Sequence, residues 1–100
     1  MNNSVTDSEL YRVLASLHSE EEIRILFEDL CTYKEIEQMS QRLIAAEMLM
    51  QGMTYTQVTS KTDISTATLS RVSRCIQHGS GGYSSVLRRC MAVKEDGSND

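Results

Sequence analysis

A chain of 100 residues with a formal net charge of −4 has room for one small domain, which on its own buries only a modest part of its surface. Proline is absent, aromatic residues make up 5% of the chain, and six methionines suit an all-helical core. No apolar run approaches the ~20 residues of a membrane span, so we expect no membrane partner.

Helix starts are marked along the chain by a hydroxyl residue followed three positions later by Glu or Gln. This pattern occurs at Thr6 with Glu9, Ser19 with Glu22, Thr32 with Glu35, and Thr54 with Gln57. Ser65 caps a fifth helix, and a sixth begins near Tyr83 after the flexible stretch HGSGG at 78–82. No strand pattern competes, so the sequence predicts an all-α fold of six helices.

Apolar residues recur at helical spacing in the first three helices. The stripes are Leu10, Val13, Leu14 and Leu17; then Ile23, Leu26, Phe27 and Leu30; then Ile36, Met39, Leu43, Ala46 and Met50, before Gly52 ends the third helix. The first two stripes, on helices at about 6–18 and 20–31, cannot all be covered within so small a monomer, which predicts that they form a homodimer interface. We expect one domain at 1–94 and a disordered tail, EDGSND, at 95–100.

The segment 54–76, TYTQVTSKTDISTATLSRVSRCI, has the pattern of a DNA-binding helix-turn-helix. The five positions that pack between the two helices of such a motif are held by Val58, Thr62, Ile64, Leu69 and Val72. Asp63 replaces the usual turn glycine and Thr59 a usual alanine, and both substitutions are tolerable in size and backbone preference. An ordinary helical hairpin is the alternative interpretation.

The second helix of this motif begins with small side chains that can approach base edges, and basic residues flank them. The candidate DNA-binding residues are Thr56, Lys61, Ser65, Thr66, Ala67, Ser70, Arg71 and Arg74. Because the leading turn has no Asn, Gln or Arg for a bidentate base contact, we expect specificity to depend on water and DNA deformability.

Charge is divided unequally along the chain, and the basic half contains the helix-turn-helix. Residues 1–47 carry ten acidic against four basic side chains, whereas residues 48–94 carry six basic side chains against Asp63 alone. A solvated surface can also produce such a division, but its location favours double-stranded DNA as partner.

The remaining polar residues form no pattern typical of an enzyme or a metal site. Cys31, Cys75 and Cys90 are odd in number and widely separated, so we expect buried thiols in a reducing cytoplasm and not a disulfide framework. His18 and His78 are far apart, and no catalytic nucleophile motif or phosphate-binding loop occurs. The sequence therefore predicts a protein that is not an enzyme, with no catalytic or metal-binding residues.

The segment 30–91 resembles the Trp repressor (TrpR) family, in particular the TrpR-like YerC/YecD group. The resemblance depends on LCTYKEIEQMSQRL, on QGMTYTQV at the end of an amphipathic helix, and above all on ISTATLSRVSRCI. It implies an intertwined homodimer that presents two recognition helices to a palindromic operator, and thus a sequence-specific transcriptional regulator, most simply a repressor. A helical protein-interaction module that has lost operator recognition is the alternative.

The resemblance also implies a site for L-tryptophan or another small corepressor beside the recognition helix. The matching positions are Thr32, Arg42 and Arg71, which keep the family's residue types, whereas Val72 replaces a glycine and Cys75 a serine. For Arg42 an ion pair with Glu35, Glu37 or Glu47 is the alternative role, and for Arg71 a phosphate contact. A repressor that works without a ligand is the simpler model.

Overall fold

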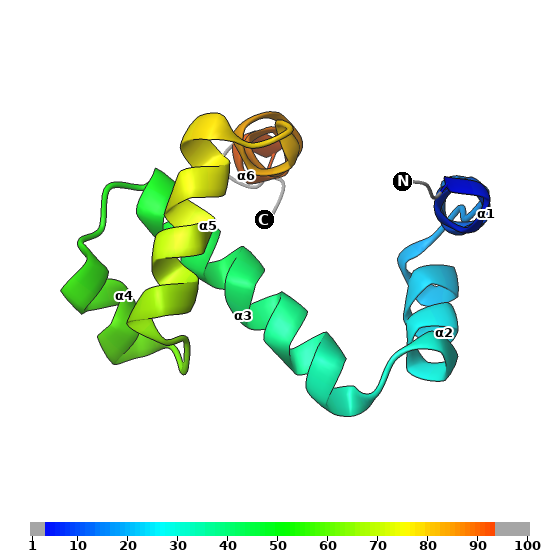
Figure 1. Cartoon of the computed structure of the whole chain (residues 1–100), viewed down its shortest axis with the longest axis horizontal. Coiled ribbons are helices and arrows are strands. Elements are labelled where there is room, and N and C mark those ends of the chain that lie inside the picture. Colours follow the sequence, from blue (N-terminus) through cyan, green and yellow to red (C-terminus); the bar gives the residue numbers. More distant parts are fainter. Residues whose placement is uncertain (1–3, 94–100) are drawn as a thin grey trace. The chain divides into compact units, whose positions relative to one another are not determined.

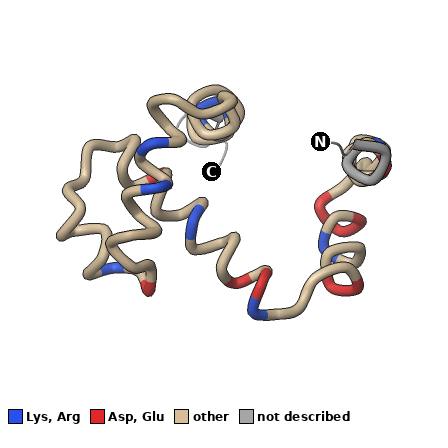
Figure 2. Tube along the Cα trace, viewed as in Figure 1, with Lys and Arg blue, Asp and Glu red and all other residues tan. Residues whose placement is uncertain are grey.

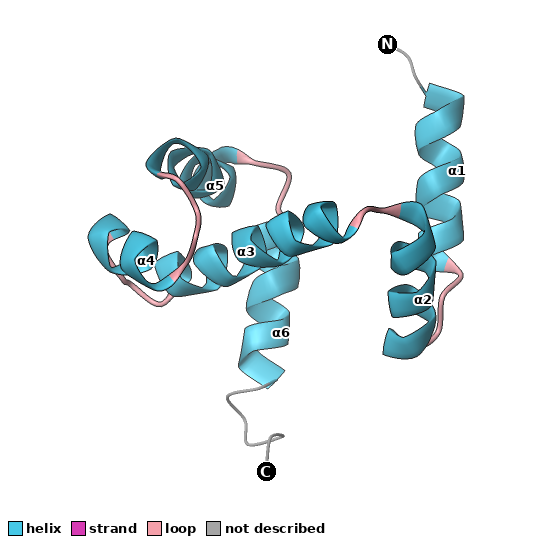
Figure 3. Ribbon diagram, turned by 90° about the horizontal axis from the view of Figure 1, so that it is seen from below, coloured by secondary structure: helices cyan, strands magenta, loops and turns pink. Residues whose placement is uncertain are grey.

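The computed structural model describes the backbone of residues 4–93 and the side chains of residues 8–92. Over this range the chain is helical and contains no strand (Figure 3). The elements are α1 (Ser4–Ala15), α2 (Glu20–Leu30), α3 (Tyr33–Met50), α4 (Tyr55–Lys61), α5 (Thr66–His78), a π-helical turn η1 (Gly82–Leu87) and α6 (Arg88–Val93). The predicted all-α fold with six helices is confirmed, and the tail predicted at 95–100 lies outside the described residues.

The chain divides into two compact units, with the boundary between Ile36 and Glu37 near the start of α3. The first unit contains α1 and α2, and the second contains most of α3 together with α4, α5, η1 and α6 (Figure 1). None of the helices in the described range is long and apolar enough to cross a membrane.

Side-chain caps start most of the helices where the sequence predicts them. Thr32 Oγ1 accepts from the Glu35 backbone N–H at 3.0 Å while Glu35 Oε1 accepts from the Thr32 N–H at 2.9 Å. Thr54 and Gln57 make the same pair of bonds at 3.1 and 2.8 Å, and Ser65 accepts from the N–H three residues on at 3.1 Å. Each cap satisfies N–H groups that a helix start leaves unpaired, so α3, α4 and α5 begin as predicted.

The first helix differs from its prediction at both ends. α1 begins at Ser4, so Thr6 lies inside the helix and does not cap it, and α1 ends at Ala15, before the predicted end near residue 18. The Glu9 carboxylate forms a salt bridge with Arg12 one turn later, at 2.6 Å. A hydroxyl residue three positions before a Glu is therefore not sufficient to start a helix when the preceding residues can also be helical.

The core of the second unit is small and consists of side chains from α3, α4, α5 and the link between the last two. Its buried members are Ala45, Ala46, Val58, Ile64, Leu69 and Val72. Two consecutive alanines on α3 leave room for other helices to pack closely against its backbone. Of the stripe predicted on α3, Ala46 lies in this core whereas Leu43 is 48% exposed, because the core uses the small residues of α3.

Two glycines with positive φ lie at helix boundaries in the second unit. Gly52, at φ 95°, ends α3 as predicted, and its N–H donates to the Leu49 carbonyl at 3.0 Å. Gly81, at φ 98°, precedes η1, and its carbonyl accepts from the N–H groups of Ser85 and Val86 at 2.9 and 3.4 Å. This i→i+5 bond widens the turn, so the segment predicted as a helix from Tyr83 is a π-turn followed by α6.

Candidate nucleic-acid interface

The short helices α4 and α5 are joined by residues 62–65, as a helix-turn-helix requires (Figure 1). Four of the five predicted inward positions are buried, with exposed fractions of 0% for Val58, 9% for Ile64, 0% for Leu69 and 1% for Val72. Thr62 is half-buried, and its hydroxyl donates to the Val58 carbonyl at 2.9 Å. The predicted interior of the motif is therefore confirmed.

The two residues that depart from the usual composition of the motif are accommodated locally. Thr59 is half-buried, and its hydroxyl donates to the backbone carbonyl of Thr56 at 3.2 Å, so its extra polar group has a partner. Asp63 is exposed, and its backbone N–H donates to the side-chain oxygen of Gln41 on α3 at 3.1 Å. Gln41 was not among the site residues predicted from the sequence, because its partner lies 22 positions away.

The recognition-helix candidate α5 has one buried face and one outward face. Leu69 and Val72 anchor the buried face. Ala67, Arg71 and Arg74 are exposed and, at spacings of four and three residues, lie on one outward face together with the half-buried Ser70. Thr66, at the start of the helix, is also exposed. The structure thus brings these five predicted DNA-binding residues together on one accessible helix.

The other predicted contact residues lie around the start of this helix. Thr56 in the first turn of α4 and Lys61 at its end are both exposed. Ser65 is exposed as well, but its hydroxyl accepts from the Thr68 N–H and donates to the Thr68 hydroxyl at 3.0 Å. Ser65 is therefore engaged in capping α5, while the contact assigned to it on DNA stays a prediction.

Basic side chains in the helix-turn-helix have no acidic partner among the described residues. Salt bridges within residues 8–92 involve Arg12 and Arg24 of the first unit, whereas Lys61, Arg71 and Arg74 form none. Glu21 and Glu28 raise the pKa of Arg24 through hydrogen bonds and the charge of Glu28. Figure 2 shows the acidic positions gathered along α2 and the start of α3, with basic positions along α5. Unpaired cations on an exposed helix are available to phosphates.

The three predicted ligand-binding residues are divided between the two units. Thr32 lies in the first unit, where its hydroxyl caps α3. Arg42 is half-buried on α3 and Arg71 is exposed on α5, both in the second unit. Neither arginine forms a salt bridge within the described residues, so the alternative ion pairs of Arg42 are not formed. Their role in ligand binding stays a prediction.

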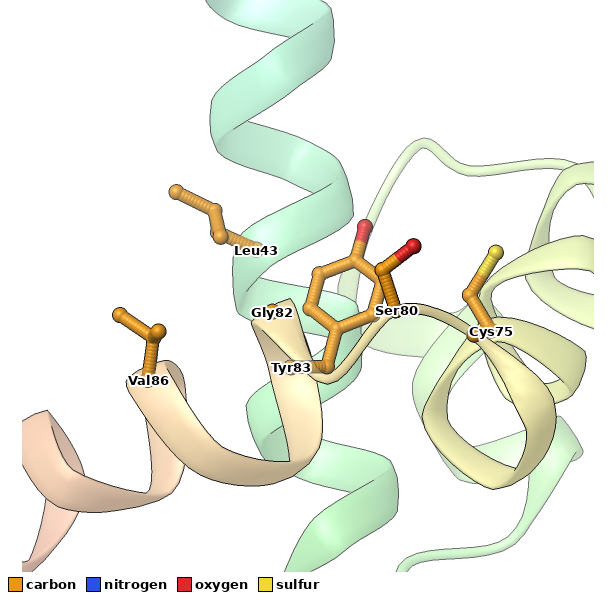
Figure 4. Close-up of a pocket in the computed structure, with 7 residues that line it drawn as sticks. Leu43, Cys75, Ser80, Gly82, Tyr83 and Val86 are labelled. Carbon is orange, nitrogen blue, oxygen red and sulfur yellow. The ribbon is translucent and has the colours of Figure 1, made fainter.

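A hollow of about 440 Å³ lies beside α3, the end of α5 and η1 (Figure 4). Its lining residues are Leu43, Cys75, Gly79, Ser80, Gly82, Tyr83 and Val86. Tyr83, which the sequence analysis did not single out, presents its ring in this hollow. Among the described residues no charged side chain lines it, and neither Arg42 nor Arg71 does. Such a lining gives the carboxylate and ammonium groups of a free amino acid no charged partner.

The three cysteines are free, and the prediction that their thiols are buried is wrong. Cys31 and Cys75 are half-buried, and Cys90 is exposed. Within the described part of the chain, no three His, Cys, Asp or Glu side chains gather closely enough to hold a metal ion.

Comparison with known proteins identifies the family. The family model described as "Trp repressor protein" matches residues 7–91, which is most of the chain. This protein belongs to the Trp repressor family. The match includes both the helix-turn-helix and the two helices before α3, so the resemblance expected from the sequence is confirmed.

Relatives within the Trp repressor family are similar over nearly the whole chain. The uncharacterized protein YerC of Bacillus subtilis is 40% identical over 91 residues, 91% of this chain and 88% of YerC. A candidate Trp repressor from Staphylococcus aureus has a crystal structure that matches with a TM-score of 0.81 at 40% identity, covering 88% of each chain. A TrpR-like protein from Eubacterium eligens matches with a TM-score of 0.82 at 39% identity, covering 88% of this chain and 91% of the other.

Proposed function

We propose that this member of the Trp repressor family is a DNA-binding transcriptional regulator that represses genes by occupying a palindromic operator. The observation that carries this proposal is the exposed, unpaired basic face of α5, with Arg71 and Arg74 opposite the buried anchors Leu69 and Val72. A helix held in this way can enter the major groove with its first residues toward the bases. The arginines are then placed to contact flanking phosphates.

The proposal includes a homodimer, because the first unit cannot bury its own apolar surface. No side chain from residue 8 to residue 36 is buried, and Leu10, Ile23 and Leu30 are 40%, 44% and 54% exposed. Two helices with no buried residue do not form a stable unit by themselves. A second copy that covers these stripes would also set two recognition helices about 34 Å apart, one turn of DNA.

A mass measurement in solution tests the dimer. At micromolar concentration we expect twice the chain mass of 11.3 kDa by light scattering. Leu30→Glu changes a side chain that is already exposed in the single chain, so it should leave a monomer intact but convert a dimer to monomers. Tyr11→Glu, at a 65% exposed position outside both stripes, is the matched control and should remain dimeric. A wild-type mass of one chain would contradict the proposal.

Selection of the purified protein against a random duplex DNA pool tests operator binding. At near-physiological salt we expect an enriched palindrome, as a two-fold dimer of helix-turn-helix motifs requires. Two results together would favour the alternative of an interaction module: no DNA sequence is enriched, and the protein pulls down a protein partner in a complex that withstands high salt.

The same selection with and without L-tryptophan tests the corepressor. We expect the same palindrome and affinity in both conditions, and no heat of tryptophan binding by calorimetry. The reason is that Val72, at the position of a family glycine, is 1% exposed in the core, and no charged side chain of residues 8–92 lines the hollow beside Cys75. Enrichment that requires tryptophan would show instead that Thr32, Arg42 and Arg71 form a working ligand site.

A further inference from the structure

One hydrogen bond differs from every other side-chain hydrogen bond within residues 8–92. The Asp63 backbone N–H donates to Gln41 Oε1 at 3.1 Å across 22 positions of sequence. The other side-chain bonds in this range join residues at most four positions apart, within one element or next to its ends. The bond to Gln41 therefore links different elements, the helix α3 and the turn of the helix-turn-helix.

Two neighbouring N–H groups of the turn have partners within the motif, whereas the Asp63 N–H has its partner on α3. The Thr62 N–H donates to the Val58 carbonyl at 3.0 Å, and the Ile64 N–H lies 3.4 Å from the Thr62 hydroxyl. Between them, the Asp63 N–H finds its acceptor on α3. Asp63 is exposed, so the bond to Gln41 acts mainly through its direction and not by satisfying a buried donor.

Gln41 lies on α3 one turn before Ala45, which is fully buried in the core. The contacts of this core are made by hydrophobic side chains. Apolar packing is non-directional, and it permits small rotations of one helix over another. A hydrogen bond has a preferred distance and angle, so it adds the directional restraint that packing lacks.

We propose that Gln41 is a positioning residue that holds the turn of the helix-turn-helix on α3 and thereby sets the orientation in which α5 meets DNA. This inference depends on the proposed operator binding. Gln41 acts in it through the Asp63 backbone and touches neither base nor phosphate. It also provides an orientation of α5 that requires no small-molecule ligand.

The test compares Gln41→Met with Gln38→Met in the full-length protein, using the enriched palindromic duplex as probe. Methionine keeps the length and helix propensity of glutamine but lacks a strong acceptor, and Gln38 is an exposed residue on the same helix. We expect Gln41→Met to weaken DNA binding about fivefold, which corresponds to the net free energy of a typical hydrogen bond. The Asp63 amide should exchange faster in NMR spectra, while the slope of affinity against salt stays that of the wild type. Gln38→Met should change none of these.

A conservative variant separates the hydrogen bond from packing. Gln41→Glu keeps an acceptor for the Asp63 N–H, so it should retain slow exchange and bind DNA as well as Gln38→Glu, which adds the same charge. Unchanged exchange or unchanged affinity in Gln41→Met would overturn the proposal, and a smaller salt slope would show that Gln41 contacts phosphate itself. If the wild type binds no duplex, operator binding fails and the positioning role with it. In that case, the amide exchange rate of Asp63 in the wild type and in Gln41→Met would still report whether the hydrogen bond to Gln41 forms.

Discussion

Replacing Leu69 with alanine is expected to lower the free energy of unfolding by about 2–5 kcal/mol. Leu69 is 0% exposed and is, with Val58 and Val72, among the largest fully buried side chains of the described residues. The loss combines the transfer of its methyl groups to water with the cavity left between α4 and α5. In so small a core, neighbouring helices have few other contacts to compensate.

Chemical denaturation followed by circular dichroism measures this effect, with variants compared at one protein concentration because a dimer's stability depends on it. Leu69→Met conserves volume and apolar character, so it should cost under about 1.5 kcal/mol and serves as the matched control. A loss below about 1 kcal/mol for Leu69→Ala would mean that this side chain does not hold the motif together.

Replacing Arg74 with glutamine is expected to weaken DNA binding most at low salt and to flatten its salt dependence. Each dimer would lose two phosphate contacts, so the slope of log affinity against log salt should fall by about 1.8. The physical basis is that Arg74 is exposed on α5 and forms no salt bridge within the described residues, which leaves its charge available to DNA. Glutamine retains helix propensity, so the fold should be unchanged.

Arg89→Gln is the control for this charge change, because Arg89 is exposed on α6, outside the helix-turn-helix. Fluorescence anisotropy across a salt series should give Arg89→Gln a slope close to that of the wild type. Equal slopes for Arg74→Gln and the wild type would contradict the assignment of Arg74 to phosphate. An equal loss in both variants would indicate a non-specific effect of net charge.

Predictions that depended on neighbouring residues were confirmed most fully. The Thr54 and Gln57 cap is complete within four residues, and the cap of α5 requires only Ser65 and the backbone that follows it. The interior of the helix-turn-helix could also be predicted, because Val58 and Leu69 recur at spacings that geometry imposes on any such motif. The resemblance to the Trp repressor family, drawn from residues 30–91, was also confirmed.

Predictions that depended on which face of a helix packs against other elements were wrong or incomplete. The apolar stripe on α3 suggested that Leu43 and Ala46 share one face, but Leu43 is 48% exposed while the adjacent alanines form the core. Close packing of other helices against α3 favours small residues at the contact. The pair Thr6 and Glu9 also predicted a helix start at Thr6, but α1 begins at Ser4.

Helix content and the caps follow from the order of residues alone, since the interactions that specify them join positions at most a few residues apart. The helix-turn-helix interior could be predicted as well, because the motif fixes the spacing of its inward positions. The choice of α3's alanines as the packing face, the widened π-turn after Gly81 and the hydrogen bond from Asp63 to Gln41 arise only in the folded chain. The π-turn is local, with bonds across four and five positions from the Gly81 carbonyl. The packing of the alanines and the bond to Gln41 depend on groups that approach from distant parts of the sequence, and no local pattern in a single sequence records such distances.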